Sequence, residues 1–304
     1  MRDSPYYAQA ELLVRYLPAL AAAECFALKG GTAINLFVRD LPRLSVDIDL
    51  AYTPLTGRER ALEHIRAAMA EMAARATGLI PGLRVIATGA AEAPKQIAVA
   101  AGAQIKVEPN PVLRGTVFEP EERRLSPAAE ALFGRSATVR VVSAPDLYAG
   151  KLCAALDRGH PRDWFDVTLM LRQEALDDRL RQAFVVYLAS HGRPMAELLA
   201  PRPRPLRDSF TREFQGMARD PITVDEMEAT QALLPARLRS ALTESERSFL
   251  LSVKLGEPEW DLLPIPHLRD LPALQWKLAN IAQLRREPRR HAASVARLRA
   301  VLEL

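Results

Sequence analysis

The chain has 304 residues, of which 49% are hydrophobic, so it is long enough to bury one large core or two medium-sized cores. No apolar run approaches the roughly 18 residues of a membrane span, and residues 1–5 lack a signal-peptide pattern, so we expect a cytoplasmic protein with no membrane partner. Two distant cysteines argue against a disulfide framework or a zinc site, and the net charge of +4 permits a nucleic-acid partner without requiring one.

The first half of the chain alternates between helical and strand patterns. Apolar residues recur at helical spacing near the N-terminus and again after residue 56, and short β-like runs lie between and after these segments. Ala101 and Gly102 are typical of a hairpin turn. We expect helices over residues 6–23, 32–38 and 57–76, and strands over residues 25–28, 45–51, 84–88, 96–100, 104–108, 112–118 and 138–142.

The pattern changes at residue 143. Beyond it the segments have a helical period and are separated by proline-bearing breaks. We therefore predict an α+β protein, in which a mixed-sheet core with an N-terminal helix over residues 1–142 precedes an all-helical domain over residues 143–304. The PRPRP run at residues 201–205 indicates an extended connector rather than a recognition tail.

The most informative motif is a pair of glycines followed by two carboxylates. Gly30 and Gly31 follow a predicted strand, and Asp47 and Asp49 occupy positions i and i+2 of another, so the two carboxylates point to the same face. Neighbouring carboxylates repel each other unless a cation lies between them, and Mg²⁺ prefers carboxylate and phosphate oxygens. The alternative is a glycine turn beside a solvated acidic strand.

A third carboxylate, Glu108, ends the predicted strand over residues 104–108. A single glutamate at a strand end is usually a surface residue, but a neighbouring strand that carries Asp47 and Asp49 changes this interpretation. Three carboxylates on adjacent strands could hold one or two Mg²⁺ ions, position a nucleoside triphosphate and lower the pKa of an attacking hydroxyl. The glycine backbone could approach the phosphates closely.

Two later helices carry further charged side chains. Ser143 opens the first of them with a capping pattern, and Lys151 and Arg158 lie seven residues apart on one face. Lys151 follows Gly150, which leaves space for the lysine to reach a bound phosphate. In the next helix Asp163 and Asp166 are three residues apart and therefore share a face.

These motifs together resemble the nucleotidyltransferases with a DNA polymerase β-like fold, and within that superfamily the AbiEii/AbiGii family of bacterial toxins. The first part of the resemblance lies in residues 29–37 (KGGTAINLF) and 44–50 (LSVDIDL). The second part lies in residues 146–158 (DLYAGKLCAALDR) and 162–167 (RDWFDV). Motifs cover residues 25–172, and the helical remainder is similar more loosely.

The resemblance implies an Mg²⁺-dependent nucleotidyltransferase toxin of a toxin–antitoxin or abortive-infection (phage-defence) system, with Mn²⁺ as an alternative ion. It implies a catalytic Lys151 and a functional aspartate at Asp163 or Asp166, of which we favour Asp163. The expected catalytic residues are Asp47, Asp49, Lys151, Asp163 and Asp166, the expected metal ligands are Asp47, Asp49 and Glu108, and the expected nucleotide-binding residues are Gly30, Gly31, Thr32, Ser45 and Lys151.

The family further implies an RNA acceptor, notably the 3′ end of tRNA, and a cognate antitoxin encoded nearby. Basic residues that could contact RNA are Arg114, Arg158, Arg285, Arg286, Arg289 and Arg290, although such charges are equally common on solvated surfaces. Two other functions stay open at this point: a nucleotidyltransferase that modifies a small molecule such as an antibiotic, and a non-catalytic binding protein that retains the fold.

Overall fold

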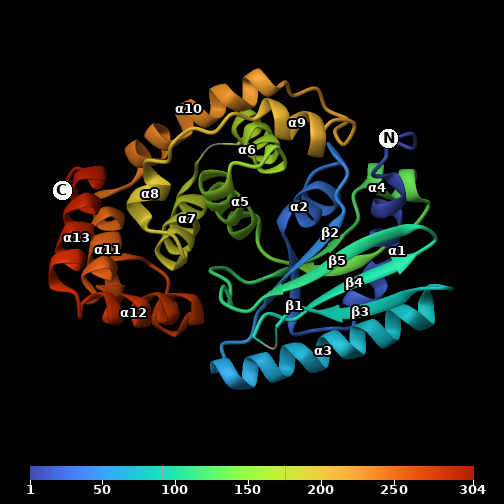
Figure 1. Ribbon diagram of the computed structural model, residues 1–304, viewed down its shortest axis with the longest axis horizontal. Helices are drawn as coiled ribbons and strands as arrows, with labels where there is room; N and C mark the ends of the chain where they lie inside the picture. Colours follow the sequence, from blue (N-terminus) through green and yellow to red (C-terminus); the bar gives the residue numbers. More distant parts are fainter. Residues whose placement is uncertain (91, 175) are drawn as a thin grey trace. The chain divides into compact units, whose positions relative to one another are not determined.

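The structure, a computed structural model, describes residues 1–90, 92–174 and 176–304 (Figure 1). The chain forms two compact units, the first from residues 1–147 and 214–221, and the second from residues 148–213 and 222–304. The boundary falls inside helix α5 (Ala144–Arg158). The domain boundary expected from the sequence, at 142/143, stays a prediction.

The first unit is built on a mixed seven-stranded sheet, in the order β3-β4-β5-β2-β1-β7-β6. Figure 1 labels strands β1 to β5 of this sheet. Strands β2 and β5 are parallel, as are β1 and β7, and the other neighbours are antiparallel. This arrangement confirms the predicted α+β class. The strands are β1 (Phe26–Lys29), β2 (Asp47–Tyr52), β3 (Arg84–Thr88), β4 (Lys95–Ala100), β5 (Ala103–Asn110), β6 (Glu121–Arg124) and β7 (Thr138–Val141).

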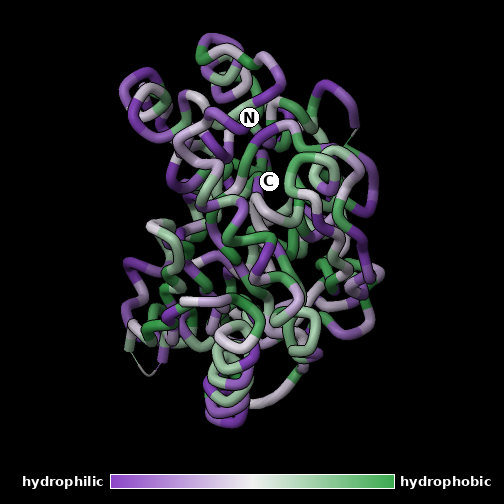
Figure 2. The backbone as a smooth tube through the Cα atoms, turned by 90° about the vertical axis from the view of Figure 1, so that its right-hand side faces the viewer, coloured by the Kyte–Doolittle hydropathy of each residue, from purple (hydrophilic) through white to green (hydrophobic). Residues whose placement is uncertain are grey.

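One face of the sheet is covered by helices α1 (Tyr7–Leu20) and α3 (Arg58–Leu79). Gln96, on the buried side of β4, ties both helices to that face: its Oε1 lies 3.4 Å from the Tyr16 hydroxyl, and its Nε2 donates to the Met69 carbonyl at 2.9 Å. In Figure 2, α3 is the helix at the bottom, with hydrophilic residues on its lower side. Burial of the opposite, apolar side holds α3 against the sheet.

The alternation along β2 and β5 leaves a polar row on the opposite face. Ile48 and Leu50 are buried, whereas Asp47 and Asp49 are half-buried. Because side chains alternate between faces along a strand, the two aspartates lie on the side of the sheet away from α1 and α3. The parallel register places Glu108 of β5 directly beside Asp49.

The predicted strand over residues 112–118 is wrong, because its backbone amides donate hydrogen bonds to side-chain oxygens instead of to a neighbouring strand. The Asn110 carboxamide oxygen accepts from the amides of Val112 and Leu113, at 3.0 and 2.8 Å, which bends the chain into a turn. The buried carboxylate of Asp146 then accepts from the amides of Val117 and Phe118, at 2.8 and 3.0 Å. These donors are therefore satisfied outside the sheet.

Three local features of the first unit differ from the sequence-based expectation. The helix expected over residues 32–38 begins two residues earlier, as α2 (Gly30–Ala33), and continues as a π-helical turn, η1 (Ile34–Val38). Strand β6 was not expected, because its sequence EERR has no alternation; it pairs only with β7, at the sheet edge. Helix α4 (Pro127–Phe133) was also not expected, although Ser126 caps it and Gly134 ends it in the left-handed region.

Among the described residues of the second unit, all regular secondary-structure elements are helices, as predicted. Helices α10 (Val224–Ala241) and α11 (Glu244–Leu255) each begin with a capping box, formed by Thr223 with Glu226 and by Thr243 with Glu246. No helix among the described residues is long and apolar enough to cross a membrane. The helices after α5 are α6 (Pro161–Gln173), α7 (Asp178–Ser190), α8 (Met195–Leu199), α9 (Arg207–Glu213), α10 (Val224–Ala241), α11 (Glu244–Leu255), α12 (Pro272–Leu284) and α13 (Pro288–Leu302), with 3-10 turns at η2 (Trp260–Leu262) and η3 (Leu268–Asp270).

A short segment, residues 214–221, returns to the first unit. There it pairs with the chain just before β2: the Leu44 amide donates to the Met217 carbonyl at 2.9 Å, and the Arg219 amide donates to the Pro42 carbonyl at 2.7 Å. This return was not visible in the sequence, because its few hydrogen bonds join residues more than 170 positions apart.

Candidate functional site

The paired glycines and the second aspartate of β2 are in direct contact. Gly30 has φ +71° and follows β1, where a left-handed backbone favours glycine. A Cβ at this position would lie 2.3 Å from Asp49 Oδ2, closer than any side chain tolerates. The carboxylate of Asp49 therefore rests against the bare backbone of Gly30, a contact that the sequence analysis did not predict.

Hydroxyl groups link the glycine turn to the first aspartate. Thr32 Oγ1 donates to the Asp47 carbonyl at 2.5 Å and lies 2.8 Å from Ser45 Oγ. Both hydroxyl-bearing residues are buried. The structure thus brings Gly30, Thr32, Ser45 and the two aspartates into one cluster within the first unit.

Arg43 belongs to the same cluster and was missed by the sequence analysis. Its side chain is buried, and its Nη1 donates to the Leu44 carbonyl at 2.8 Å and faces Met217 Sδ at 3.9 Å. A Cβ on Gly31 would meet Arg43 Nη2 at 2.4 Å, so this guanidinium fills the space that the second glycine leaves. The sequence could have indicated this placement, because Arg43, Ser45, Asp47 and Asp49 occupy alternate positions, and alternate residues of an extended chain point to the same side.

Glu108 lies beside the aspartates but has partners of its own. Its Oε1 is 2.5 Å from Lys95 Nζ of β4, and its Oε2 is 3.6 Å from Lys106 Nζ. The two lysine side chains are about half-exposed, so these pairs are weak and can exchange. Metal binding by Glu108 stays a prediction.

The donor set of β2 fits a divalent cation. Asp47 and Asp49 supply hard carboxylate oxygens on one face, half-buried, and a glycine backbone lies where a side chain would block Asp49. Within the described residues, no three His, Cys, Asp or Glu side chains converge closely enough to hold an ion between them. Metal binding by Asp47 and Asp49 stays a prediction, and the pair would need further oxygen ligands, which a substrate phosphate could supply.

The second unit contains a separate, buried charge cluster. Lys151 of α5 lies between two carboxylates of α6, with its Nζ 2.9 Å from Asp163 Oδ1 and 3.1 Å from Asp166 Oδ2. Arg158 also binds Asp163: its Nε and Nη2 donate hydrogen bonds to the two carboxylate oxygens, at 2.6 and 3.0 Å. The predicted shared faces of Lys151 with Arg158, and of Asp163 with Asp166, are therefore confirmed.

The electrostatics of this cluster are balanced, with two cations against two carboxylates. Burial alone would raise the pKa of Asp163, but the charges of Lys151 and Arg158 and their hydrogen bonds outweigh it and hold that pKa well below its usual range. Asp163 also lies in the first turn of α6, where the helix dipole favours a negative charge. The lysine is consequently held in one orientation rather than free to rotate.

The space beside Gly150 is used differently from what the sequence suggested. A Cβ at position 150 would meet the Tyr187 ring at 3.2 Å, so the glycine admits the close packing of α7 rather than making room for Lys151. The lysine side chain is itself buried by more than nine-tenths. Which of the two aspartates is functional stays open, since both contact it.

The arginines that were expected to contact RNA are dispersed. Arg114 is buried, donates to the Thr56 carbonyl at 3.1 Å and has a pKa lowered by its burial and by nearby Arg58. Arg285 pairs with an exposed glutamate of the loop after α11. Arg289 and Arg290 begin α13 after the predicted break at Pro288, whereas Arg285 and Arg286 precede it. Their roles in RNA binding stay predictions.

Comparison with known proteins adds a family and a fold. Residues 11–280 match the family described as "Nucleotidyl transferase AbiEii toxin, Type IV TA system". No curated protein matches the sequence significantly. Among solved structures, the nucleotidyltransferase toxin MenT4 of Mycobacterium tuberculosis H37Rv is similar, with a TM-score of 0.58 and 17% identity over 90% of this chain and 92% of that chain. At this identity the structural likeness shows a shared fold.

The charge cluster yields a prediction about stability and pH. Since the folded-state pKa of Asp163 lies below the unfolded-state value of about 3.9, its stabilisation is present above that value and is lost as pH falls through the folded pKa. Asp163→Asn should lower the free energy of unfolding at neutral pH by about 3–5 kcal/mol, because it breaks a buried pair. It should also flatten the loss of stability below about pH 4, measured by urea unfolding from about pH 6 to about pH 2.

The matched control is Asp178→Asn, which removes an exposed carboxylate at the start of α7. It should cost no more than about 1 kcal/mol. If Asp163→Asn and wild type lost stability in parallel as the pH fell, the assigned pairing would be wrong.

Proposed function

Since the chain belongs to the AbiEii family of nucleotidyltransferase toxins of type IV toxin–antitoxin systems, we propose that it transfers a nucleotide unit from an Mg²⁺-bound nucleoside triphosphate to an RNA acceptor. The observation that carries this proposal is the contact between Gly30 and Asp49, which places a carboxylate of the β2 pair against a side-chain-free backbone. The backbone amides of this glycine turn could approach phosphates that the metal ion holds nearby.

Asp47 and Asp49 would hold the metal ion, with Glu108 as a third ligand once it leaves its lysine partners. When bound, the ion supplies Lewis-acid stabilisation of the triphosphate and of the departing pyrophosphate. The backbone amides of Gly30 and Gly31 would contact the phosphates, while Thr32 and Ser45 hold the glycine turn against β2. Arg43 is a positioning residue in this proposal, because it supports Gly31 from behind without being exposed.

Lys151 of the second unit is the proposed cation for the triphosphate. Its charge would offset the negative charge that develops as the phosphate bond breaks. Asp163 and Asp166 orient its ammonium group, and Arg158 fixes Asp163 in turn. The depressed pKa of Asp163 argues for an orienting role rather than general-base catalysis at neutral pH.

We take tRNA as the expected acceptor and a DNA-binding antitoxin as the expected regulatory partner, both on the strength of the family. The first experiment incubates the protein with each of the four labelled nucleoside triphosphates, with Mg²⁺ and with either total tRNA or a panel of aminoglycosides. Label in the tRNA supports the proposal. Label in an aminoglycoside would identify a small-molecule nucleotidyltransferase, and label in neither would contradict the proposed acceptor.

The carboxylate pair gives a direct prediction. Asp49→Asn should reduce nucleotide transfer by at least about 100-fold, because a metal ligand loses its charge while its shape is kept. The free energy of unfolding should stay the same or rise slightly, since repulsion between the two carboxylates is relieved. Asp3→Asn, at an exposed position near the N-terminus, is the matched control and should transfer at the wild-type rate. An Asp49→Asn protein that kept wild-type activity would refute the two-aspartate site.

Substitution of Glu108 tests whether the metal ion has two carboxylate ligands or three. Glu108→Gln should raise the Mg²⁺ concentration needed for half-maximal transfer by about 10-fold or more, because a hard anionic ligand is replaced by an amide. Lys95→Gln, which removes the competing cation at 2.5 Å, should shift the requirement in the opposite direction. Unchanged Mg²⁺ dependence in Glu108→Gln would restrict the metal ligands to the β2 aspartates.

A further inference from the structure

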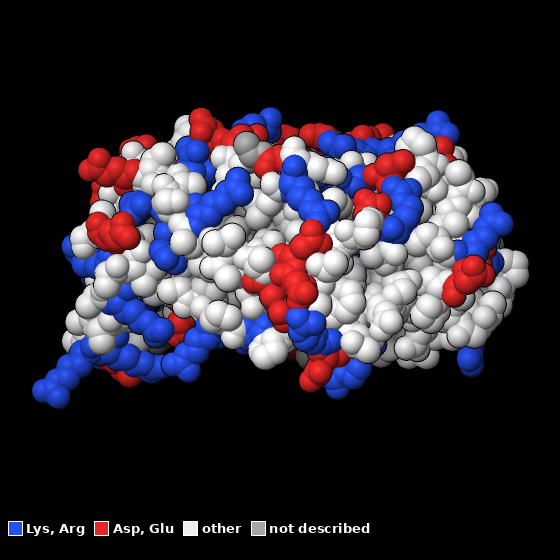
Figure 3. Space-filling view, turned by 90° about the horizontal axis from the view of Figure 1, so that it is seen from above, with Lys and Arg blue, Asp and Glu red and all other residues white. Residues whose placement is uncertain are grey.

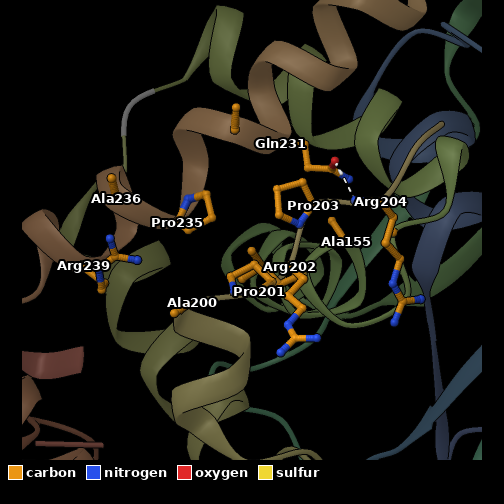
Figure 4. A pocket seen from close by; sticks show the side chains of 13 residues that line it. Ala155, Ala200, Pro201, Arg202, Pro203, Arg204, Gln231, Pro235, Ala236 and Arg239 are labelled. Carbon is orange, nitrogen blue, oxygen red and sulfur yellow. Dashed lines mark hydrogen bonds between the residues drawn. The ribbon is translucent and has the colours of Figure 1, made fainter. Parts of the chain in front are cut away.

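A cavity of about 280 Å³ lies wholly within the second unit (Figure 4). Its walls are the last turn of α5, the PRPRP segment at residues 201–205 and the C-terminal half of α10. Most of the lining side chains are small or cyclic, which leaves the space open: Ala155, Gly159, Ala200, Pro201, Pro203, Ala232, Pro235 and Ala236.

The charges on the cavity wall have one sign. Arg202, Arg204 and Arg239 contribute guanidinium groups, and none of the lining residues is an aspartate or a glutamate. Arg204 Nη1 and Arg239 Nη1 each donate to a backbone carbonyl, those of Arg158 and Leu199, at 3.0 and 2.5 Å. Each guanidinium therefore keeps most of its five donors for a ligand. An anion is the complementary ligand.

The segment that carries two of these arginines is rigid and extended. Three prolines at alternate positions fix its backbone φ angles and remove amide donors, so the segment loses little entropy when a ligand binds. Arg202 and Arg204 extend to the same side of it in Figure 4. Their Cα atoms stand two residues apart, at most about 7 Å in an extended chain, which is comparable to the separation of successive phosphates in a nucleic-acid strand.

The cavity is connected to the Lys151 cluster through the end of α5. Arg204 donates a hydrogen bond to the Arg158 carbonyl and packs on Gly159. The Arg158 side chain donates a hydrogen bond to the Asp163 carboxylate. Asp163 in turn contacts Lys151 at 2.9 Å. One chain of contacts within the second unit therefore joins a ligand in the cavity to the proposed triphosphate-binding lysine.

We propose that this cavity binds the sugar–phosphate backbone of a single-stranded segment of the acceptor RNA. The identity of the nucleic acid as the acceptor RNA rests on the proposed function, whereas the arrangement of arginines around the cavity is observed independently of it. Basic and acidic side chains are interspersed on the face of the molecule in Figure 3, so a general basic field does not explain this site. The absence of carboxylates from the cavity wall distinguishes it from that mixed surface.

The same phosphate chemistry could come from a free nucleoside triphosphate, and the experiment separates the two sources. The probe is a single-stranded RNA oligonucleotide with a 5′ fluorophore, whose binding is followed by anisotropy over a series of KCl concentrations. Each lost phosphate contact should reduce the slope of log K against log salt by about 0.7. For Arg202→Gln/Arg204→Gln we expect a reduction of about 1.4, with several-fold weaker binding at low salt.

Two controls keep the result interpretable. Arg237→Gln/Arg269→Gln removes the same charge from exposed positions of the second unit that do not line the cavity, and its slope should match wild type. Arg202→Gln alone should reduce the slope by about 0.7, and it is expected to fold normally, because within the described chain this side chain has no hydrogen-bond or ion-pair partner. Mg²⁺–ATP affinity, measured by calorimetry, should be the same in all variants.

Equal salt slopes for wild type and the cavity variants would overturn the proposal, as would wild-type protein that binds no RNA. Loss of ATP affinity with RNA binding intact would assign the cavity to the nucleotide instead, and would also overturn it. Asp49→Asn should bind RNA with the wild-type slope while losing transfer. If instead Asp49→Asn retained transfer, the proposed catalytic site would fail, and the salt slopes would still decide the role of the cavity.

Discussion

The candidate site of the first unit depends on the close approach between the Gly30 backbone and the Asp49 carboxylate. Strand β2 has β1 on one side and β5 on the other, so its position in the sheet is set by two ladders of hydrogen bonds. In that position Asp49 Oδ2 occupies the place of a Cβ at residue 30. Glycine is therefore required both by the left-handed φ and by the space, and the two half-buried carboxylates lie on the face of the sheet away from α1 and α3.

The second unit contains a buried lysine whose charge must be stabilised. Burying Lys151 would be costly without partners, and two carboxylates and a further arginine supply them in a balanced set. Such a cluster holds its charges at fixed positions, which is what transition-state stabilisation of a phosphoryl group requires. The same helix end carries the backbone carbonyl that anchors the arginine-lined cavity.

Local sequence patterns predicted the features that depend on nearby residues. The i and i+2 spacing of Asp47 and Asp49 placed them on one face, and the helix-face spacing placed Lys151 and Arg158 together. Features set by distant contacts were missed. The Asp146 carboxylate accepts hydrogen bonds from two backbone amides of the segment that was predicted to be a strand. Residues 214–221 return to the first unit, where Met217 contacts Arg43. Neither contact leaves a periodic trace in the sequence.

The most direct measurement of the central claim is nucleotide transfer by Gly30→Ala. A methyl group at this position would meet Asp49 Oδ2 at 2.3 Å in a left-handed backbone, so the carboxylate would be displaced. Gly78→Ala, in α3 with open space around its Cα, is the matched control and should retain wild-type activity. The account predicts that Gly30→Ala remains folded by circular dichroism and loses transfer by about 100-fold or more. A folded Gly30→Ala protein with wild-type transfer would contradict it.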